Sequence, residues 1–356
     1  MSKPFNPNGP LWDIALDDLP KIVAFWLLGA KRSGDSLEFR TPIQALHYAI
    51  ALALPPVHLA YDTLTTGSLN LTSPTTIWIT YFSVLTVFWI RTNIWTTKTI
   101  EPLLRELGKS ITSRGIRNYV GFARSTTSKK WQITWYISFV TSLNAILFIS
   151  ERLNGATEKL GISCLSYIAL SFCAIHVAGG GWLAFAAIRL VPDIIKDGGL
   201  QLLPYMPAHS LEIQISTQSY HRIIYRGCLG AIALSVPIYK WWQVQPYAPN
   251  IITSTLLLGA VVFTLLLSAA IRPGLAWNKA IKWEQNRSIC SLLATLPEKP
   301  ANIDGSEKEK ALISLMEMTS RNGGNILAKE LLLAIFPSLL GGFLPSIAVE
   351  LFRTLQ

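Results

Sequence analysis

The stretch ISCLSYIALSFCAIHVAGGGWLAFAAI (Ile162–Ile188) decides the fold, because it runs its whole length without Asp, Glu, Lys or Arg. A transmembrane helix needs roughly 20 consecutive apolar residues, so this stretch is long enough to cross a bilayer even when tilted. Only 15% of the chain is charged, whereas soluble domains carry about 25% charged residues. Together these features predict an integral membrane protein.

Five more apolar stretches lie on either side of this one. Gly227–Tyr239 is shorter than a bilayer core, so we expect Arg226 and Lys240 to extend their charged ends to opposite interfaces. The sequence therefore predicts an all-α integral membrane protein with six transmembrane helices in its core, residues 43–271. Their predicted limits are 43–61, 75–90, 133–150, 162–188, 227–239 and 251–271.

The basic residues alternate between the two sides of this core. The segments before, between and after the six stretches and a seventh at 331–349 hold 5, 0, 9, 2, 4, 1, 9 and 1 of the 31 Lys and Arg residues. Positively charged loops are retained on the cytoplasmic side of a membrane. We therefore expect a multi-pass protein with a cytoplasmic N-terminus and with the basic loops 91–132, 189–226 and 272–330 on the same side.

A net charge of +10 would indicate nucleic-acid binding in a soluble protein. In a membrane protein the same charge faces the lipid bilayer, where anionic lipid headgroups attract Lys and Arg. The expected partners are therefore anionic lipid headgroups and further copies of the chain in a homo-oligomer, and not nucleic acid.

Helices are also expected outside the bilayer. Arg91 is expected to end the second span, and Thr99–Gly115 to form a separate amphipathic helix in the loop that follows. The N-terminal segment 1–42 is expected to be cytoplasmic, with an interfacial helix at Leu11–Ala30. Residues 272–330 are expected to form a cytoplasmic helical hairpin that continues the sixth span.

The last apolar segment, residues 331–349, contains helix-breaking residues at close intervals. Proline removes a backbone donor, and irregular backbone is tolerated at membrane depth only inside protein or beside a water-filled cavity. Residues 331–356 are therefore predicted to be a broken or re-entrant seventh membrane segment and tail. The interrupting residues are Pro337, Gly341, Gly342 and Pro345.

The polar residues expected inside the membrane are few and include no carboxylate. Proton-coupled transporters and intramembrane metal enzymes usually need buried Asp or Glu, so those classes are disfavoured and no metal or cofactor is expected. His47 and His58 lie roughly 16 Å apart along one helix face, too far apart to bind one metal ion. Histidines at this depth are expected to form interhelical hydrogen bonds, and a proton path or ligand site is the alternative. The full set of intramembrane polar candidates is His47, His58, His176 and Asn144.

Two further groups have alternative interpretations. Gly179, Gly180 and Gly181 indicate either close helix packing or a hinge or pore constriction. Asp193 and Asp197, four residues apart, indicate either an ordinary helix end before Gly198 or a carboxylate pair for cation binding or acid–base catalysis. The remaining cytoplasmic candidates, which would act with that pair, are His209 and His221.

Three functions follow from these features. The first is a pore-forming or channel-like transport protein gated from its basic cytoplasmic side, in which Gly179–Gly181 and the broken segment shape the pore. The second is a membrane-embedded lipid- or acyl-modifying enzyme with His209 or His221 as base; a non-enzymatic role is favoured because no catalytic sequence motif is present. The third is a scaffold subunit whose basic loops, including Lys129 and Lys130, bind a partner or anionic lipid.

Overall fold

The computed structural model describes residues 11–154, 164–202, 210–244 and 249–295, which are mostly helical. The helices are α1 (Leu11–Asp18), the short 3-10 helix η1 (Leu19–Lys21), α2 (Val23–Leu27), α3 (Thr41–Thr66), α4 (Pro74–Ser110), α5 (Ser113–Thr126), α6 (Lys129–Asn154), α8 (Cys164–Ile195), α9 (Leu211–Val244) and α10 (Pro249–Thr295). One two-stranded antiparallel sheet joins β1 (Ala30–Ser33) to β2 (Ser36–Phe39), with Ala30 opposite Phe39. The described chain is therefore mostly helical, as expected, and this hairpin is its one departure from an all-α fold.

Three of these helices, α3, α4 and α8, are long and apolar enough to cross a membrane, which is consistent with a membrane protein. The other predicted spans within the described chain, 133–150, 227–239 and 251–271, lie inside α6, α9 and α10. Six spans and a seventh are therefore a prediction that the structure supports only in this coarser form. The second arm of the predicted hairpin and the segment 331–356 lie outside the described residues.

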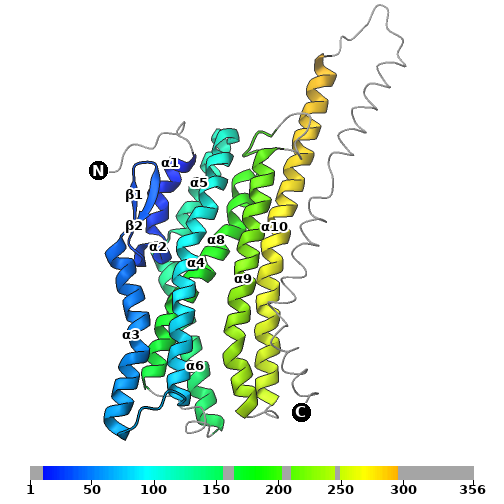
Figure 1. Cartoon of the computed structure of the whole chain (residues 1–356). Helices are drawn as coiled ribbons and strands as arrows, with labels where there is room; N and C mark the ends of the chain where they lie inside the picture. Colours follow the sequence, from blue (N-terminus) through cyan, green and yellow to red (C-terminus); the bar gives the residue numbers. More distant parts are fainter. Residues whose placement is uncertain (1–10, 155–163, 203–209, 245–248, 296–356) are drawn as a thin grey trace, which may run out of the picture.

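Helix α8 lies at the centre of the bundle (Figure 1) and packs against α4, α5, α6 and α10. We call residues 11–40, 91–130, 182–202, 210–226 and 272–295 the basic half, and the remaining described residues the apolar half. Figure 1 places α1, the β-hairpin and α5 at one end of the bundle, with α6 and the far end of α3 at the other. The only Lys or Arg residues within the described apolar half are Arg152 and Lys240.

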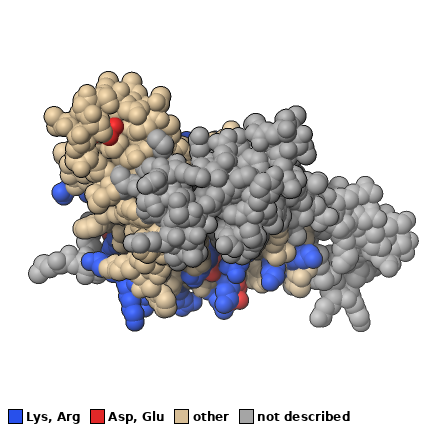
Figure 2. Space-filling model, turned by 90° about the horizontal axis from the view of Figure 1, so that it is seen from below, with Lys and Arg blue, Asp and Glu red and all other residues tan. Residues whose placement is uncertain are grey.

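The basic and the uncharged segments of the sequence thus lie at opposite ends of the described bundle. Figure 2 shows the molecule from the apolar end: the described surface is mostly uncharged, and Lys and Arg lie along one edge of the view. In the most apolar stretch of helix α3 only 11% of the residues are buried. Leu46, Leu52 and Leu64 of this helix are exposed. Exposed apolar side chains at this density are expected where a helix faces lipid.

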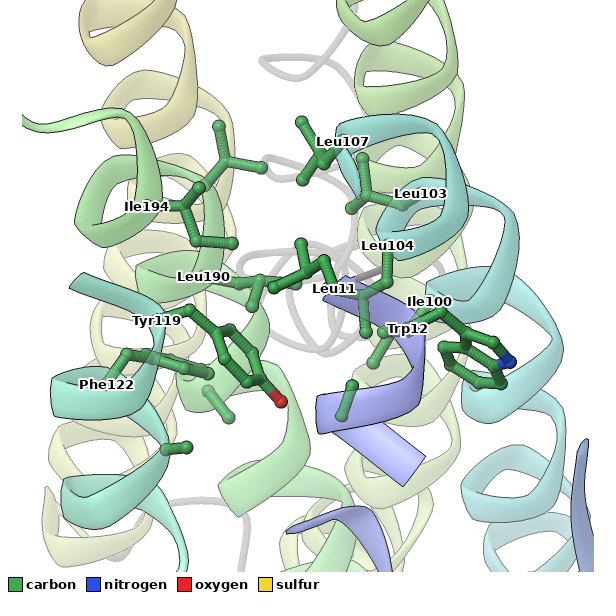
Figure 3. Close-up of a cluster of buried hydrophobic side chains, with 14 of the residues drawn as sticks. Leu11, Trp12, Ile100, Leu103, Leu104, Leu107, Tyr119, Phe122, Leu190 and Ile194 are labelled. Carbon is green, nitrogen blue, oxygen red and sulfur yellow. The ribbon is translucent and has the colours of Figure 1, made fainter. Parts of the chain in front are cut away.

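The basic half has a hydrophobic core of its own. Figure 3 shows α1, α4, α5 and α8 directing apolar side chains toward one another. Leu11 and Leu107 are fully buried, and Trp277 of α10 joins the same cluster. The residues labelled in Figure 3 are Leu11, Trp12, Ile100, Leu103, Leu104, Leu107, Tyr119, Phe122, Leu190 and Ile194.

Helix α4 does not end at Arg91, as the sequence predicted, but continues without interruption to Ser110. Arg91 is exposed, so its charge stays on the outside of the helix. Inside the helix Thr92 and Thr96 satisfy their hydroxyls by donating to the carbonyls of residues four positions earlier. The predicted helix 99–115 is therefore largely the second half of α4, and the chain turns only at residues 111–112.

The N-terminal segment is folded against the bundle, whereas the sequence predicted one interfacial helix over Leu11–Ala30. The extended backbone of Ile22 (φ −70°, ψ 124°) separates α1 and η1 from α2. The Trp12 indole and the Arg105 guanidinium both donate to the carbonyl of Asp35, at 2.8 and 2.7 Å, and hold the hairpin tip on α4. Arg32 donates to Asp17 at 2.8 Å, and this hydrogen bond raises the pKa of Arg32.

Candidate intramembrane polar site

Two of the three predicted intramembrane histidines meet between α3 and α8. Nδ1 of His47 lies 3.1 Å from Nε2 of His176, so one ring donates and the other accepts according to their tautomers. His176 is almost completely buried, whereas His47 is half-buried. The Phe172 ring is stacked on His47, with centroids 5.8 Å apart, and meets His176 edge-on. The expected interhelical histidine hydrogen bond is therefore present.

A second group of polar atoms lies one turn further along α8. Asn93 of α4 donates through Nδ2 to the carbonyl of His176 at 3.1 Å, while its Oδ1 is buried without a hydrogen-bond partner in the described chain. The Tyr136 hydroxyl of α6 and the Trp89 Nε1 of α4 are also buried and have no described partner. A Cβ built on Gly179 would lie 2.9 Å from the Tyr136 hydroxyl and 3.1 Å from Asn93 Nδ2. The Tyr136 hydroxyl and the Asn93 amide therefore lie beside the same face of α8.

The chemistry of this group suits an uncharged polar species. Asn93 Oδ1 accepts, the Trp89 indole donates, and the Tyr136 hydroxyl does either. No member is a carboxylate, ammonium or guanidinium group, and an ion buried without a counter-charge is strongly disfavoured. A bound water needs two to four polar partners, and Asn93 Oδ1 and the Tyr136 hydroxyl, beside Gly179 and Gly180, are of the kind that supplies two of them. The Trp89 Nε1 lies on the edge of its ring that faces Gly230 of α9 instead.

The three predicted glycines are where bulky rings approach α8. A Cβ on Gly180 would lie 2.4 Å from Cζ3 of Trp89, and a Cβ on Gly181 would lie 3.2 Å from Cζ2 of Trp135. The Trp135 indole also donates to the carbonyl of Ala178 at 2.9 Å. On its other edge the Trp89 ring meets Gly230 of α9, where a Cβ would lie 2.6 Å from Cζ2. This geometry matches the packing interpretation of the glycine run.

The other intramembrane candidates lie apart from this site. Asn144 of α6 donates to the Ser171 hydroxyl of α8 at 3.0 Å, and this hydrogen bond joins the two helices. Asn144 also donates to the Val140 carbonyl within its own helix. His58 is buried on α3, and both of its ring nitrogens are without a hydrogen-bond partner among the described residues. The sequence placed His47 and His58 on one helix face, but only His47 reaches His176.

The candidate residues of the basic half do not form a common site in the described chain. Asp193 accepts from Arg189 of its own helix at 2.9 Å, whereas Asp197 lies 3.7 Å from Arg114 of α5. Helix α8 ends at Ile195, and Asp197 has left-handed backbone with φ 57°, so the two carboxylates do not share a helix face. His221 is half-buried on α9. Four of the pore candidates and one histidine lie outside the described residues: Pro337, Gly341, Gly342, Pro345 and His209.

Sequence reasoning missed Asn93, Tyr136 and Trp89. Asn93 follows Arg91, where the sequence predicts the span to end, so its position in the sequence indicates a loop. Within the described ranges, no group of three or more His, Cys, Asp and Glu side chains is placed to hold a metal ion. Comparison with protein families, with curated proteins and with solved structures finds no match for this chain.

Proposed function

We propose that the protein is a channel-like membrane protein that conducts a small polar species, above all the proton, along α8. The observation that carries this proposal is the hydrogen-bonded pair His47–His176 in the apolar half, beside Asn93 Oδ1 and the Tyr136 hydroxyl, which have no hydrogen-bond partner among the described residues. Ionisable and polar groups at membrane depth are costly, and they usually mark ion pathways and proton relays.

A small permeant fits the packing better than a wide pore does. Rings of Trp89 and Trp135 fill the space beside Gly180 and Gly181, which argues against a wide pore at the glycine run. Histidine suits proton transfer because its ordinary pKa lies near neutral pH and it has two ring nitrogens.

The pair can pass one proton with both rings starting and ending neutral. In the tautomer where His47 Nδ1 donates to His176 Nε2, a proton added to His47 Nε2 makes that ring cationic. The bridging proton then crosses to His176 Nε2, and the proton on His176 Nδ1 leaves. One proton enters and one departs, and both rings end as their Nε2–H tautomers. A second turnover therefore requires each ring to gain a proton at Nδ1 and lose the one at Nε2.

The proposal keeps the basic half on the cytoplasmic side, as the distribution of Lys and Arg predicts. The core of the basic half holds α8 in position, because Leu190 and Ile194 of α8 are buried in that core. Movement of that core would shift His176 relative to His47, and this is the gate that we propose.

The test is proton flux into liposomes that contain the purified full-length chain and an internal pH-sensitive dye. We expect flux above that of empty liposomes, and a loss of at least tenfold for His176→Ala and for His47→Ala. His221→Ala, in the basic half, is the matched control and should retain the flux. Folded protein that conducts neither protons nor other ions would refute the function, while flux untouched by His176→Ala would refute the site.

A further inference from the structure

Helix α5 presents a row of arginines on its outer face. Arg114, Arg117 and Arg124 are exposed and recur at helical spacing, whereas Tyr119 and Phe122 on the opposite face are buried in the core of the basic half. Lys129 and Lys130, both exposed, begin α6 directly after the turn that ends α5. Five exposed positive charges thus fall within residues 114–130, on α5 and at the start of α6.

Most of this positive charge has no counter-ion within the described chain. Arg114 lies 3.7 Å from Asp197, but Arg117, Arg124, Lys129 and Lys130 form no ion pair among the described residues. Asp18 lines the same small cavity as Thr127 of this turn. Asp18 accepts from Lys21 at 2.7 Å, so its charge is already balanced.

The helix that follows turns its apolar residues outward. Trp131 is 63% exposed, Ile133 is 50% exposed and Ile137 is 62% exposed. Exposed apolar residues on a helix that carries a predicted span indicate contact with lipid tails, and Trp prefers the headgroup level. Lys129 and Lys130, immediately before Trp131, are therefore at the height of lipid phosphates.

We propose that Arg124, Lys129 and Lys130 form a binding site for the phosphate of an anionic phospholipid headgroup, whose tails lie against Trp131 and Ile133. Guanidinium and ammonium groups donate charge-assisted hydrogen bonds to phosphate oxygens. Each basic residue near an anionic surface strengthens attraction by about fivefold. The site is independent of proton conduction, because it lies on the outer surface and away from His176.

The test uses the folded full-length chain in detergent micelles, titrated with short-chain phosphatidylglycerol and followed by tryptophan fluorescence. The triple variant Arg124→Gln, Lys129→Gln, Lys130→Gln should bind at least tenfold more weakly than the wild type. A matched triple, Lys279→Gln, Lys282→Gln, Arg287→Gln, removes the same charge from exposed positions of α10 and should bind as the wild type does.

Two further ligands identify the source of the phosphate. Short-chain phosphatidylcholine, which has no net charge, and inorganic phosphate, which has no tail, should both bind weakly. Equal loss in both triple variants would overturn the proposal, since net charge alone would then explain the binding. Inorganic phosphate binding as tightly as the lipid would overturn it as well. If the first triple does not fold, the single variants Lys129→Gln and Lys130→Gln should each still lose several-fold, and unchanged affinity in both would reject the site.

Discussion

Gly180→Ala is expected to destabilise the protein because the Trp89 ring occupies the place of the new methyl group. The alanine Cβ would lie 2.4 Å from Cζ3 and 2.7 Å from Cε3 of that ring. Carbon atoms pack best at about 3.5–4.0 Å, so the ring has to retreat by roughly 1 Å. On its other edge the ring is bounded by Gly230 of α9, where a Cβ would lie 2.6 Å from Cζ2.

The size of the effect follows from two opposing contributions. Overpacking a well-filled core costs about 1–3 kcal/mol, and replacing glycine by alanine inside a helix contributes at most about 1 kcal/mol of stability. We therefore expect Gly180→Ala to lower the free energy of unfolding by about 1–2 kcal/mol. Gly121→Ala is the matched control, since Gly121 is exposed on α5 with no atom within 4 Å of the new Cβ. That variant should gain about 0.5–1 kcal/mol.

The assay is denaturant unfolding of the purified protein in detergent, followed by near-ultraviolet circular dichroism. Combining Gly180→Ala with Gly230→Ala should cost more than the sum of the two single changes, because each methyl group blocks the retreat that the other requires. In a Trp89→Ala background, Gly180→Ala should become neutral or stabilising. If Gly180→Ala is as stable as Gly121→Ala in the wild-type background, the ring does not pack between the two glycines and the argument fails.

Three other predictions use neighbouring or opposed residues. Phe25→Ala, at a fully buried position, should cost about 3–5 kcal/mol of unfolding free energy, whereas Trp26→Ala next to it, 65% exposed, should cost far less; equal losses would contradict the described core. Burial raises the pKa of Glu284 above its ordinary value of 4.5, so the folded protein binds this proton more tightly than the unfolded protein does. The stability of the folded protein therefore falls as the pH rises from the ordinary pKa through the raised one. Glu284→Gln should therefore unfold at higher denaturant concentration at neutral pH, and its advantage should shrink toward pH 4; an advantage constant with pH would refute this assignment. Cys290, exposed in the basic half, should react with a membrane-impermeant maleimide only after permeabilisation, whereas Cys164, exposed in the apolar half, should react in intact cells; the reverse pattern would invert the proposed orientation.

The sequence predicted helices well where apolar length alone determines them. Ile43–Tyr61 lies inside α3, and the described part of Ile162–Ile188, residues 164–188, lies inside α8. An uncharged stretch of that length satisfies its backbone hydrogen bonds within a membrane by forming a helix. The limits were less predictable. Arg91 could not be recognised as a residue within a helix, because whether a charge ends a span or only points outward depends on the neighbouring helices.

The basic half and the polar site were harder to predict for the same reason. The hairpin Ala30–Phe39 lacks the strict alternation of a strand and is held by contacts from Trp12 and Arg105, which are far away in sequence. The pairing of His47 with His176 depends on how α3 packs on α8. The spacing of residues within one helix relates His47 to His58, but it does not predict contact with His176, which lies on another helix.

The packing around α8 bears on how a gate would work. Its 32 residues extend roughly 48 Å at the helical rise of 1.5 Å per residue, and the 14-residue step from His176 to Leu190, about 21 Å, joins the polar site to the core of the basic half. Rings from α4 and α6 press on Gly180 and Gly181, so the glycine run has no space in which to bend. In the gate that we propose, a displacement of Leu190 in the basic half would therefore move α8 as one body. Such a shift of about 1–2 Å, of the size that helices make at interfaces, is enough to break a 3.1 Å contact between His47 and His176.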